Sequence, residues 1–262
     1  MSSPVPPPAS RPSGRVGLSP AAVPAQQQRT GLTALTAVFV ALALVTGGAR
    51  TALNPPAAAP SAAPTVTGYT PDPPVPTEAR TSLYRSQQAA SGAFVNTTLK
   101  LSAASRATTV NPFTVKVETS LRTDPDAVAR IIHEVLDDER GWASYGKNSF
   151  NLVPTDAPDQ ITFYLASPPT VDALCGADVT KGSWDCRKGR TIVLNSDRWF
   201  YGSPTFDSVA DYRAFMINRQ VGFLLGQSTT TCKKKGTKAP VMMDQGKSLE
   251  GCLANPWPRT AG

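Results

Sequence analysis

The chain has 262 residues, a formal net charge of +7, 25 prolines, four cysteines and one histidine, His133. Catalytic zinc sites commonly take two or three histidines from the protein, and hydrolases usually take a histidine as general base, so one imidazole excludes most of this chemistry. Fifteen of the prolines lie in the first 80 residues, which predicts a non-globular N-terminal region followed by one folded domain.

Residues 1–30 are predicted to form a disordered cytoplasmic tail, because they contain seven prolines and three arginines but no acidic residue. Residues 31–49 carry no charge, and a helix needs about 20 apolar residues to cross a bilayer. We therefore predict a transmembrane signal anchor, with the arginine-containing tail on the cytoplasmic side. Gly47 and Ala49 also fit a signal-peptide cleavage site, which would make the protein secreted.

Residues 50–80 are rich in alanine and proline, with Pro-Pro pairs at 55–56 and 73–74. This composition predicts a semi-extended linker that holds the domain away from the membrane. Residues 81–262 are then expected to form an extracytoplasmic domain of a single-pass cell-membrane protein.

Residues 113–120 alternate apolar and polar side chains like a half-buried strand. A helix is predicted next, with Asp124 as its cap and Pro125 at its first position. Its apolar stripe consists of Val128, Ile131, Ile132, Val135 and Leu136. His133 lies off this stripe beside charged residues, so we expect it to be a solvated surface side chain.

Residues 151–153, 161–166 and 191–195 are predicted to be further strands. A second helix is expected from about Ser208 to Leu225, with Gly226 ending it. The order of strand, helix, several strands and a helix indicates the α+β class. The final stretch contains three prolines and is expected to be irregular.

All four cysteines, Cys175, Cys186, Cys232 and Cys252, follow the predicted membrane segment, in a compartment where disulfides persist. The sequence does not fix their pairing. The local option joins Cys175 with Cys186 and Cys232 with Cys252, and each short loop is worth roughly 3 kcal/mol in the chain-entropy description. A zinc site built from all four cysteines is disfavoured because no Cys-x-x-Cys pair is present.

Short motifs between about residues 110 and 258 match, in order, those of one protein family. They are Gly141-Trp142, Leu165-Ala166-Ser167-Pro168, Leu174-Cys175, Cys186, Val193-Leu194-Asn195, Arg198-Trp199, Tyr212-Arg213, Asn218, Val221-Gly222, Leu225-Gly226, Cys232, Ala239-Pro240-Val241-Met242, Gly251-Cys252 and Asn255-Pro256-Trp257-Pro258. With them, the chain resembles a family of zinc metallopeptidases found in exported or membrane-anchored bacterial proteins. The resemblance implies a zincin-like domain, in which a mixed sheet accompanies the helix that carries the active site.

In that family the position of Asn218 is followed by His-Glu-Val-Gly-His-x-Leu-Gly-His-x-His, a metzincin-like signature. Two histidines four residues apart on one helix face coordinate zinc, and the glutamate activates the zinc-bound water. A glycine then turns the chain so that a third histidine reaches the metal. In this chain the five corresponding positions are Arg219, Gln220, Phe223, Gln227 and Thr229. Guanidinium and phenyl groups do not coordinate a metal and an amide is not a base near neutral pH, so a site of this type cannot form.

The resemblance therefore implies a degenerate member with no metal and no cofactor. Met242 or Met243 matches the methionine turn that lies under the zinc in metzincins, and without metal it becomes a core side chain. Tyr212, Met216, Arg219 and Phe223 share one face of the second helix. Either this face is a repacked core, or Arg219 and Gln220 line a pocket that binds an extended peptide or an acidic group without cutting it.

Other catalytic constellations are weak in this sequence. No Gly-x-Ser-x-Gly motif is present. The acidic run at 137–139 is interpreted as a polar helix end, and no nucleic-acid motif is found. The basic run at 233–238 is interpreted as a solvated loop or as a contact with anionic envelope polymers or lipid headgroups.

We therefore expect a membrane-anchored extracytoplasmic pseudo-peptidase without catalytic activity and with a binding or structural role in the cell envelope. Its expected partners are the membrane and an envelope protein, peptide or anionic polymer. Two alternatives remain: a hydrolase that uses a non-zinc site, and a purely structural domain without a ligand.

Overall fold

The computed structural model describes residues 68–154 and 157–259. The expected tail, the expected membrane anchor and residues 50–67 of the expected linker lie outside the described residues. Among the helices that are described, none is long and apolar enough to cross a membrane.

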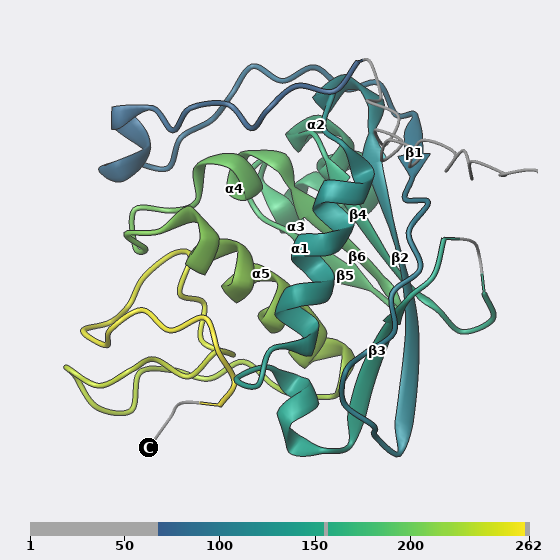
Figure 1. The fold of residues 1–262 in the computed structure, drawn as a ribbon. Coiled ribbons are helices and arrows are strands. Elements are labelled where there is room, and N and C mark those ends of the chain that lie inside the picture. The colour runs from purple at the N-terminus through teal and green to yellow at the C-terminus, as the bar shows by residue number, and fades with distance from the viewer. Residues whose placement is uncertain (1–67, 155–156, 260–262) are drawn as a thin grey trace, which may run out of the picture. The chain divides into compact units, whose positions relative to one another are not determined.

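A mixed six-stranded sheet forms the centre of the domain (Figure 1). Its strands are β1 (Phe94–Asn96), β2 (Thr109–Glu118), β3 (Asn148–Leu152), β4 (Ile161–Ala166), β5 (Cys186–Lys188) and β6 (Thr191–Asn195). They are arranged in the order β1-β2-β4-β6-β5, and β3 also pairs with β2. Phe113 aligns with both Leu152 and Ile161, so β3 and β4 flank β2 on opposite sides. These pairs and β4–β6 are parallel, whereas β1 and β5 join antiparallel.

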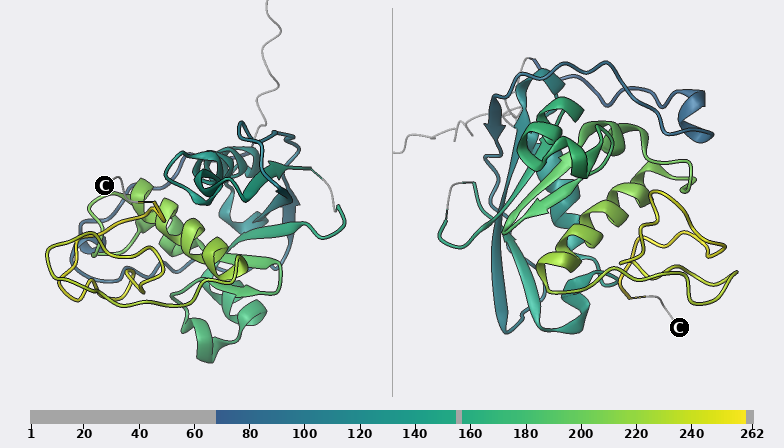
Figure 2. Two further views of the ribbon diagram at one scale, coloured as in Figure 1. Left: turned by 90° about the horizontal axis from the view of Figure 1, so that it is seen from below. Right: turned by 180° about the vertical axis from the view of Figure 1, so that it is seen from behind.

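The larger core lies between one face of this sheet and three helices, α1 (Pro125–Asp137), α4 (Ser196–Tyr201) and α5 (Val209–Leu224). Figures 1 and 2 show α1 and α5 against the same side of the sheet. Strand side chains alternate between faces, so Phe163 and Leu165 join this core while Tyr164 points to the opposite face. The helix α5, which carries Arg219, Gln220 and Phe223, is thus packed directly on the sheet.

The opposite face is covered by α2 (Pro168–Cys175), which contributes Val171 and Cys175 to a smaller cluster with Val193, and α3 (Ala177–Thr180) packs against α2. Glu118, at the end of β2, is fully buried beside the first turn of α2. Its carboxylate accepts a hydrogen bond from the backbone N–H of Ser167 at 2.6 Å and another from the Thr170 hydroxyl at 2.7 Å. The remaining helical turns are three short 3-10 helices, η1 (Thr77–Arg80), η2 (Thr119–Leu121) and η3 (Trp142–Tyr145).

The predicted α+β class and both long helices are confirmed. The Asp124 side chain accepts a hydrogen bond from the N–H of Asp126, and the Ser208 side chain accepts one from the N–H of Asp211. Strands expected at 161–166 and 191–195 are found there, whereas those expected at 113–120 and 151–153 occupy 109–118 and 148–152.

The prediction that His133 is a solvated surface side chain is wrong. Its ring is partly buried and stacks at 6.3 Å from the ring of Phe113. Its Nε2 atom is enclosed and has no hydrogen-bond partner among the residues that the structure describes. The apolar stripe of a surface helix is wider than its central line, so a ring at its border still reaches the sheet.

Residues 68–80, which the sequence assigned to the linker, contact the domain. The N–H of Thr70 donates to the carbonyl of Arg122 at 2.8 Å, and Asp72 pairs with Arg213 at 2.5 Å. Further along, Ser86 donates from its backbone N–H and its hydroxyl to Asp197. The packed part of the chain therefore begins before the expected boundary at residue 81.

The local pairing of the cysteines is confirmed, with disulfides between Cys175 and Cys186 and between Cys232 and Cys252. The first ties α2 to β5. The second closes the irregular segment that follows α5, as expected, and this segment lies beside α5 and away from β1 and β2 (Figures 1 and 2).

Candidate functional site

The five positions that the sequence comparison aligned with a zinc signature are divided between α5 and the turn after it. Arg219, Gln220 and Phe223 lie in the last two turns of the helix, which ends at Leu224. Gly226 then adopts a positive φ of 83°, which a glycine tolerates without steric cost, and the chain turns. Gln227 and Thr229 follow this turn and are exposed.

Arg219 is held over Phe223 and next to an aspartate of the C-terminal segment. Its guanidinium carbon lies 4.8 Å from the centre of the Phe223 ring, and its Nη2 lies 3.7 Å from Asp244 Oδ1. The side chain of Arg219 keeps 16% of its surface exposed. A cation stacked on an aromatic face and facing a carboxylate is positioned for recognition of charge but not for binding a metal.

Gln220 points to the residue before β5. The buried amide of Gln220 donates to Asp185 Oδ2 at 3.1 Å. Burial raises the pKa of the Asp185 carboxyl, and the Gln220 hydrogen bond and the Arg219 charge act in the opposite direction without cancelling the shift. A carboxyl group with a raised pKa next to an amide and a guanidinium can donate a hydrogen bond as well as accept one.

Two further buried groups surround Asp185. Arg198 of α4 has no exposed surface, and burial lowers the pKa of its guanidinium. Its Nη2 donates to the carbonyl of Tyr84, while its Nε and Nη1 have no partner among the described residues. Burial also raises the pKa of the Tyr212 hydroxyl, with a further contribution from the Asp185 charge. Arg219 and Gln220 therefore border a buried polar cluster and not a purely apolar core.

The opposite side of α5 is held in place by contacts of Asn218 and Gly222. Asn218 is fully buried and donates from Nδ2 to the backbone carbonyl of Pro256 at 3.0 Å, while the backbone carbonyl of Asn218 accepts from the indole N–H of Trp142 at 2.8 Å. Of the two candidate methionines, Met242 packs against Gly222 of α5, and Met243 belongs to a separate cluster with Ala239 and Cys252. Met242 is therefore the methionine that lies against the motif helix.

We expect Gly222→Ala to lower the free energy of unfolding by about 1–2 kcal/mol, the cost of overpacking less the helix preference of alanine. A methyl group at this position would lie 2.3 Å from Met242 Sδ and 2.8 Å from Trp142 Cζ2. The measurement is denaturant unfolding of the four proteins in a double-mutant cycle with Met242→Ala. The substitution should cost less in the Met242→Ala background, and an equal cost in both backgrounds would contradict the contact.

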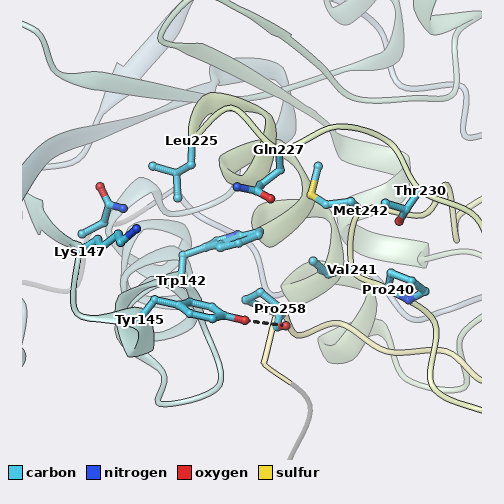
Figure 3. Close-up of a pocket in the computed structure, with 11 residues that line it drawn as sticks. Trp142, Tyr145, Lys147, Leu225, Gln227, Thr230, Pro240, Val241, Met242 and Pro258 are labelled. Carbon is cyan, nitrogen blue, oxygen red and sulfur yellow. Dashed lines mark hydrogen bonds between the residues drawn. The ribbon is translucent and has the colours of Figure 1, made fainter.

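A cavity of about 490 Å³ lies beneath the carboxyl end of α5 (Figure 3). Three segments form its walls: η3 with the start of β3, the turn after α5, and the C-terminal segment. The lining residues are Trp142, Tyr145, Lys147, Asn148, Leu225, Gln227, Thr230, Pro240, Val241, Met242 and Pro258. Of the five motif positions, Gln227 alone reaches this cavity.

No group of three or more histidine, cysteine, aspartate or glutamate side chains comes together as a metal site within residues 68–154 and 157–259. The groups that do converge are Arg219, Gln220, Asp185 and Asp244. Together they offer both charges and an amide at the edge of the sheet, which is suited to binding polar groups of a ligand.

Comparison with known families gives one match. A model described as "Protein of unknown function (DUF3152)" matches residues 83–257. The chain belongs to this family. No curated protein and no solved structure matches the chain significantly.

The DUF3152 region contains α5, both disulfides and every residue of the polar cluster. It begins at residue 83, next to Tyr84, whose carbonyl accepts the hydrogen bond from buried Arg198. The contacts of residues 68–80 with Arg122 and Arg213 therefore extend the packed structure beyond the residues that the DUF3152 model matches.

Sequence reasoning missed Asp185, Asp244 and the cluster role of Arg198 in this DUF3152 domain. Asp185 precedes a three-residue edge strand, and Asp244 lies in an irregular segment, so no periodic pattern marked either of them. The one available signal was the adjacency of Asp185 to Cys186, because a disulfide fixes the backbone on which the carboxylate stands.

Proposed function

We propose that this protein is a membrane-anchored, extracytoplasmic pseudo-peptidase with a zincin-like domain. It is a degenerate relative of zinc metallopeptidases that binds a peptide or another envelope component without cutting it. The observation that carries the proposal is the state of the motif positions on α5: Arg219 and Gln220 are both engaged with carboxylates, at 3.7 and 3.1 Å.

This network favours binding over the purely structural alternative. A repacked core would place apolar side chains at these positions, because buried charges are costly unless they are paired. Instead Arg219 and Asp244 both remain partly exposed. Paired charges at a solvent-accessible edge can exchange their partner for a carboxylate or amide of a ligand.

The retained frame supports descent from a peptidase. Asn218, Gly222 and Gly226 stand where the signature has them, and each has a structural task in holding or ending α5. If the domain is zincin-like, the sheet beside α5 and Met242 beneath the helix correspond to the scaffold that once held the metal.

Export of the domain is the part of the proposal that rests on sequence and cysteine pairing. Both disulfides fit a compartment in which thiols are oxidised. The basic run at 233–238 is exposed throughout and suits a contact with anionic envelope polymers or lipid headgroups.

The full-length protein is expected to retain no stoichiometric zinc after incubation with the metal and desalting, and to leave a peptide mixture uncut. The measurements are elemental analysis and mass spectrometry of the peptides with and without a chelator. Stoichiometric zinc together with chelator-sensitive cleavage would overturn the proposal. Cleavage that survives the chelator and is lost in Asp185→Asn would favour the non-zinc hydrolase instead.

The matched variant combines Arg219→His, Gln220→Glu, Phe223→His and Thr229→His. Two histidines four apart on α5, with a third after the Gly226 turn, supply the usual ligands, so we expect this variant to retain about one zinc ion per chain. If it binds no zinc while remaining folded, the frame around α5 is not that of a former zinc site.

A further inference from the structure

The cavity under the carboxyl end of α5 has the size and walls of a ligand site. Its volume of about 490 Å³ lies within the range of roughly 300–1,000 Å³ typical of small-ligand pockets. In Figure 3 Lys147 stands at one end, Thr230 and Pro240 stand at the other, and the indole of Trp142 lies between them.

The aromatic wall of the cavity is fixed before any ligand arrives. The Trp142 indole N–H donates to the carbonyl of Asn218 at 2.8 Å, which sets the plane of the ring. The Tyr145 ring lies 6.0 Å from it, and the Tyr145 hydroxyl donates to the carbonyl of Pro258 at 3.1 Å. A pre-ordered apolar wall lowers the entropy cost of binding an apolar group.

The polar groups of the cavity include a positive charge but no negative charge. Lys147 is the one charged residue in its lining, and no acid stands among the lining residues. Thr230 Oγ1 is enclosed without a hydrogen-bond partner among the described residues. The Gln227 side chain also lines the cavity but is exposed. An enclosed hydroxyl without a partner costs free energy unless a ligand or water completes it.

We propose that this cavity binds the carboxyl-terminal apolar residues of a peptide, with the terminal carboxylate at Lys147. The apolar side chain packs on Trp142 and Met242. Thr230, at the end of the cavity opposite Lys147, and Gln227, which lies over Trp142 in Figure 3, hydrogen-bond the peptide amides. An alkyl carboxylate would satisfy Lys147 and the apolar wall but would leave the enclosed Thr230 hydroxyl without a partner.

The inference deepens the proposed function, because it rests on that proposal for the choice of a peptide as ligand. The cavity itself uses none of Arg219, Gln220 and Phe223, so the two ideas fail separately.

The test measures binding to the full-length protein by isothermal titration calorimetry with three probes: N-acetyl-Ala-Ala-Leu as the free acid, its carboxyl-terminal amide, and dodecanoate. We expect the free acid to bind at least about tenfold more tightly than the amide, since one charge-assisted contact is lost. Lys147→Gln should abolish this preference. The matched control is Lys100→Gln, which removes the same charge from an exposed position outside the cavity, and Thr230→Val should weaken both peptides.

Equal affinity for acid and amide in the unaltered protein would overturn the inference, and so would absence of peptide binding or tighter binding of dodecanoate than of the free acid. Binding that is lost in Arg219→Met but unchanged in Lys147→Gln would place the peptide at Arg219 on α5. That result would support the proposed function and overturn the inference that the peptide binds in the cavity. Zinc-dependent cleavage with a Lys147-dependent preference for the free acid would overturn the proposed function and support peptide binding in the cavity.

Discussion

Replacing Glu118 by alanine is expected to lower the free energy of unfolding by about 4 kcal/mol. Glu118 has no exposed surface, and its two carboxylate oxygens accept hydrogen bonds from the N–H groups of Ser91, Gly92 and Ser167 and from the Thr170 hydroxyl. One side chain therefore joins the segment before β1, the end of β2 and the first turn of α2.

The size of the effect follows from which donors stay buried after the substitution. Ser91 and Gly92 are exposed and can turn to water, whereas Ser167 and Thr170 are buried. Each buried donor that loses its acceptor costs about 1–3 kcal/mol, so two of them, with the loss of charge-assisted bonds, give the stated sum.

The Glu118 contribution is also expected to depend on pH. Burial alone would raise the pKa of Glu118, but the hydrogen bonds from Thr170, Gly92, Ser167 and Ser91 together bring the folded-state pKa below its ordinary value. A carboxyl whose pKa is lower in the folded state stabilises that state above its unfolded-state pKa, about 4.3 for glutamate. This stabilisation is lost as the pH falls through the lower folded-state pKa.

The measurement is urea unfolding of the wild type, Glu118→Ala and Glu118→Gln between pH 7 and pH 3. The glutamine keeps an acceptor oxygen and the side-chain volume, so it should lose less stability than the alanine. The difference between wild type and Glu118→Gln should shrink toward low pH. A difference that does not change with pH, or an alanine variant as stable as the wild type, would contradict the assigned role.

The parts of the fold that could be predicted from sequence are those with a repeating local signal. The stripe of α1 spans several turns and begins at an Asp-Pro cap, and the pattern of α5 ends at Gly226. Runs such as 161–166 and 191–195 combine β-branched residues with burial on the larger core, and both are strands.

The strands and helices that were not predicted from the sequence lack such a repeating signal. β1 and β5 have three residues each and exist because β2 and β6 offer them a free edge. In α2, Pro168 and Pro169 occupy the start of a helix of eight residues. Pro168 was part of the matched motifs, but this stretch gave no helical period. Edge strands and short helices are determined by what they pack against, so tertiary contacts decide them.

In the candidate site, too, some residues could be predicted from the sequence and others depend on tertiary contacts. The residues on α5 were found because the signature fixes their spacing, and the choice of Met242 over Met243 needed the contact with Gly222. Asp185 and Asp244 come from other segments, and their approach to Gln220 and Arg219 depends on how the edge strand and the C-terminal segment pack beside α5. His133 was misjudged because helix spacing does not show how far the sheet extends toward it.

Removing either disulfide is expected to lower the free energy of unfolding by roughly 3 kcal/mol, because the closed loops of 11 and 20 residues restrict the unfolded chain by similar amounts. The two variants, Cys175→Ala with Cys186→Ala and Cys232→Ala with Cys252→Ala, should differ in where the native structure loosens. The first loosens the junction of α2 and β5. The second frees the segment that places Val241 and Met242 against α5 and along the cavity.

Denaturant unfolding with and without a reductant, together with hydrogen exchange, separates these effects. The reductant should destabilise the wild type by about the sum of the two losses and each variant by only the loop it still has. Faster exchange at 241–242 is expected in the second variant and not in the first. Because cytoplasmic reductants keep thiols reduced, a domain that needs both disulfides is suited to an oxidising compartment. A wild type that keeps its stability with four free thiols would contradict the loop contributions and remove the cysteine argument for export.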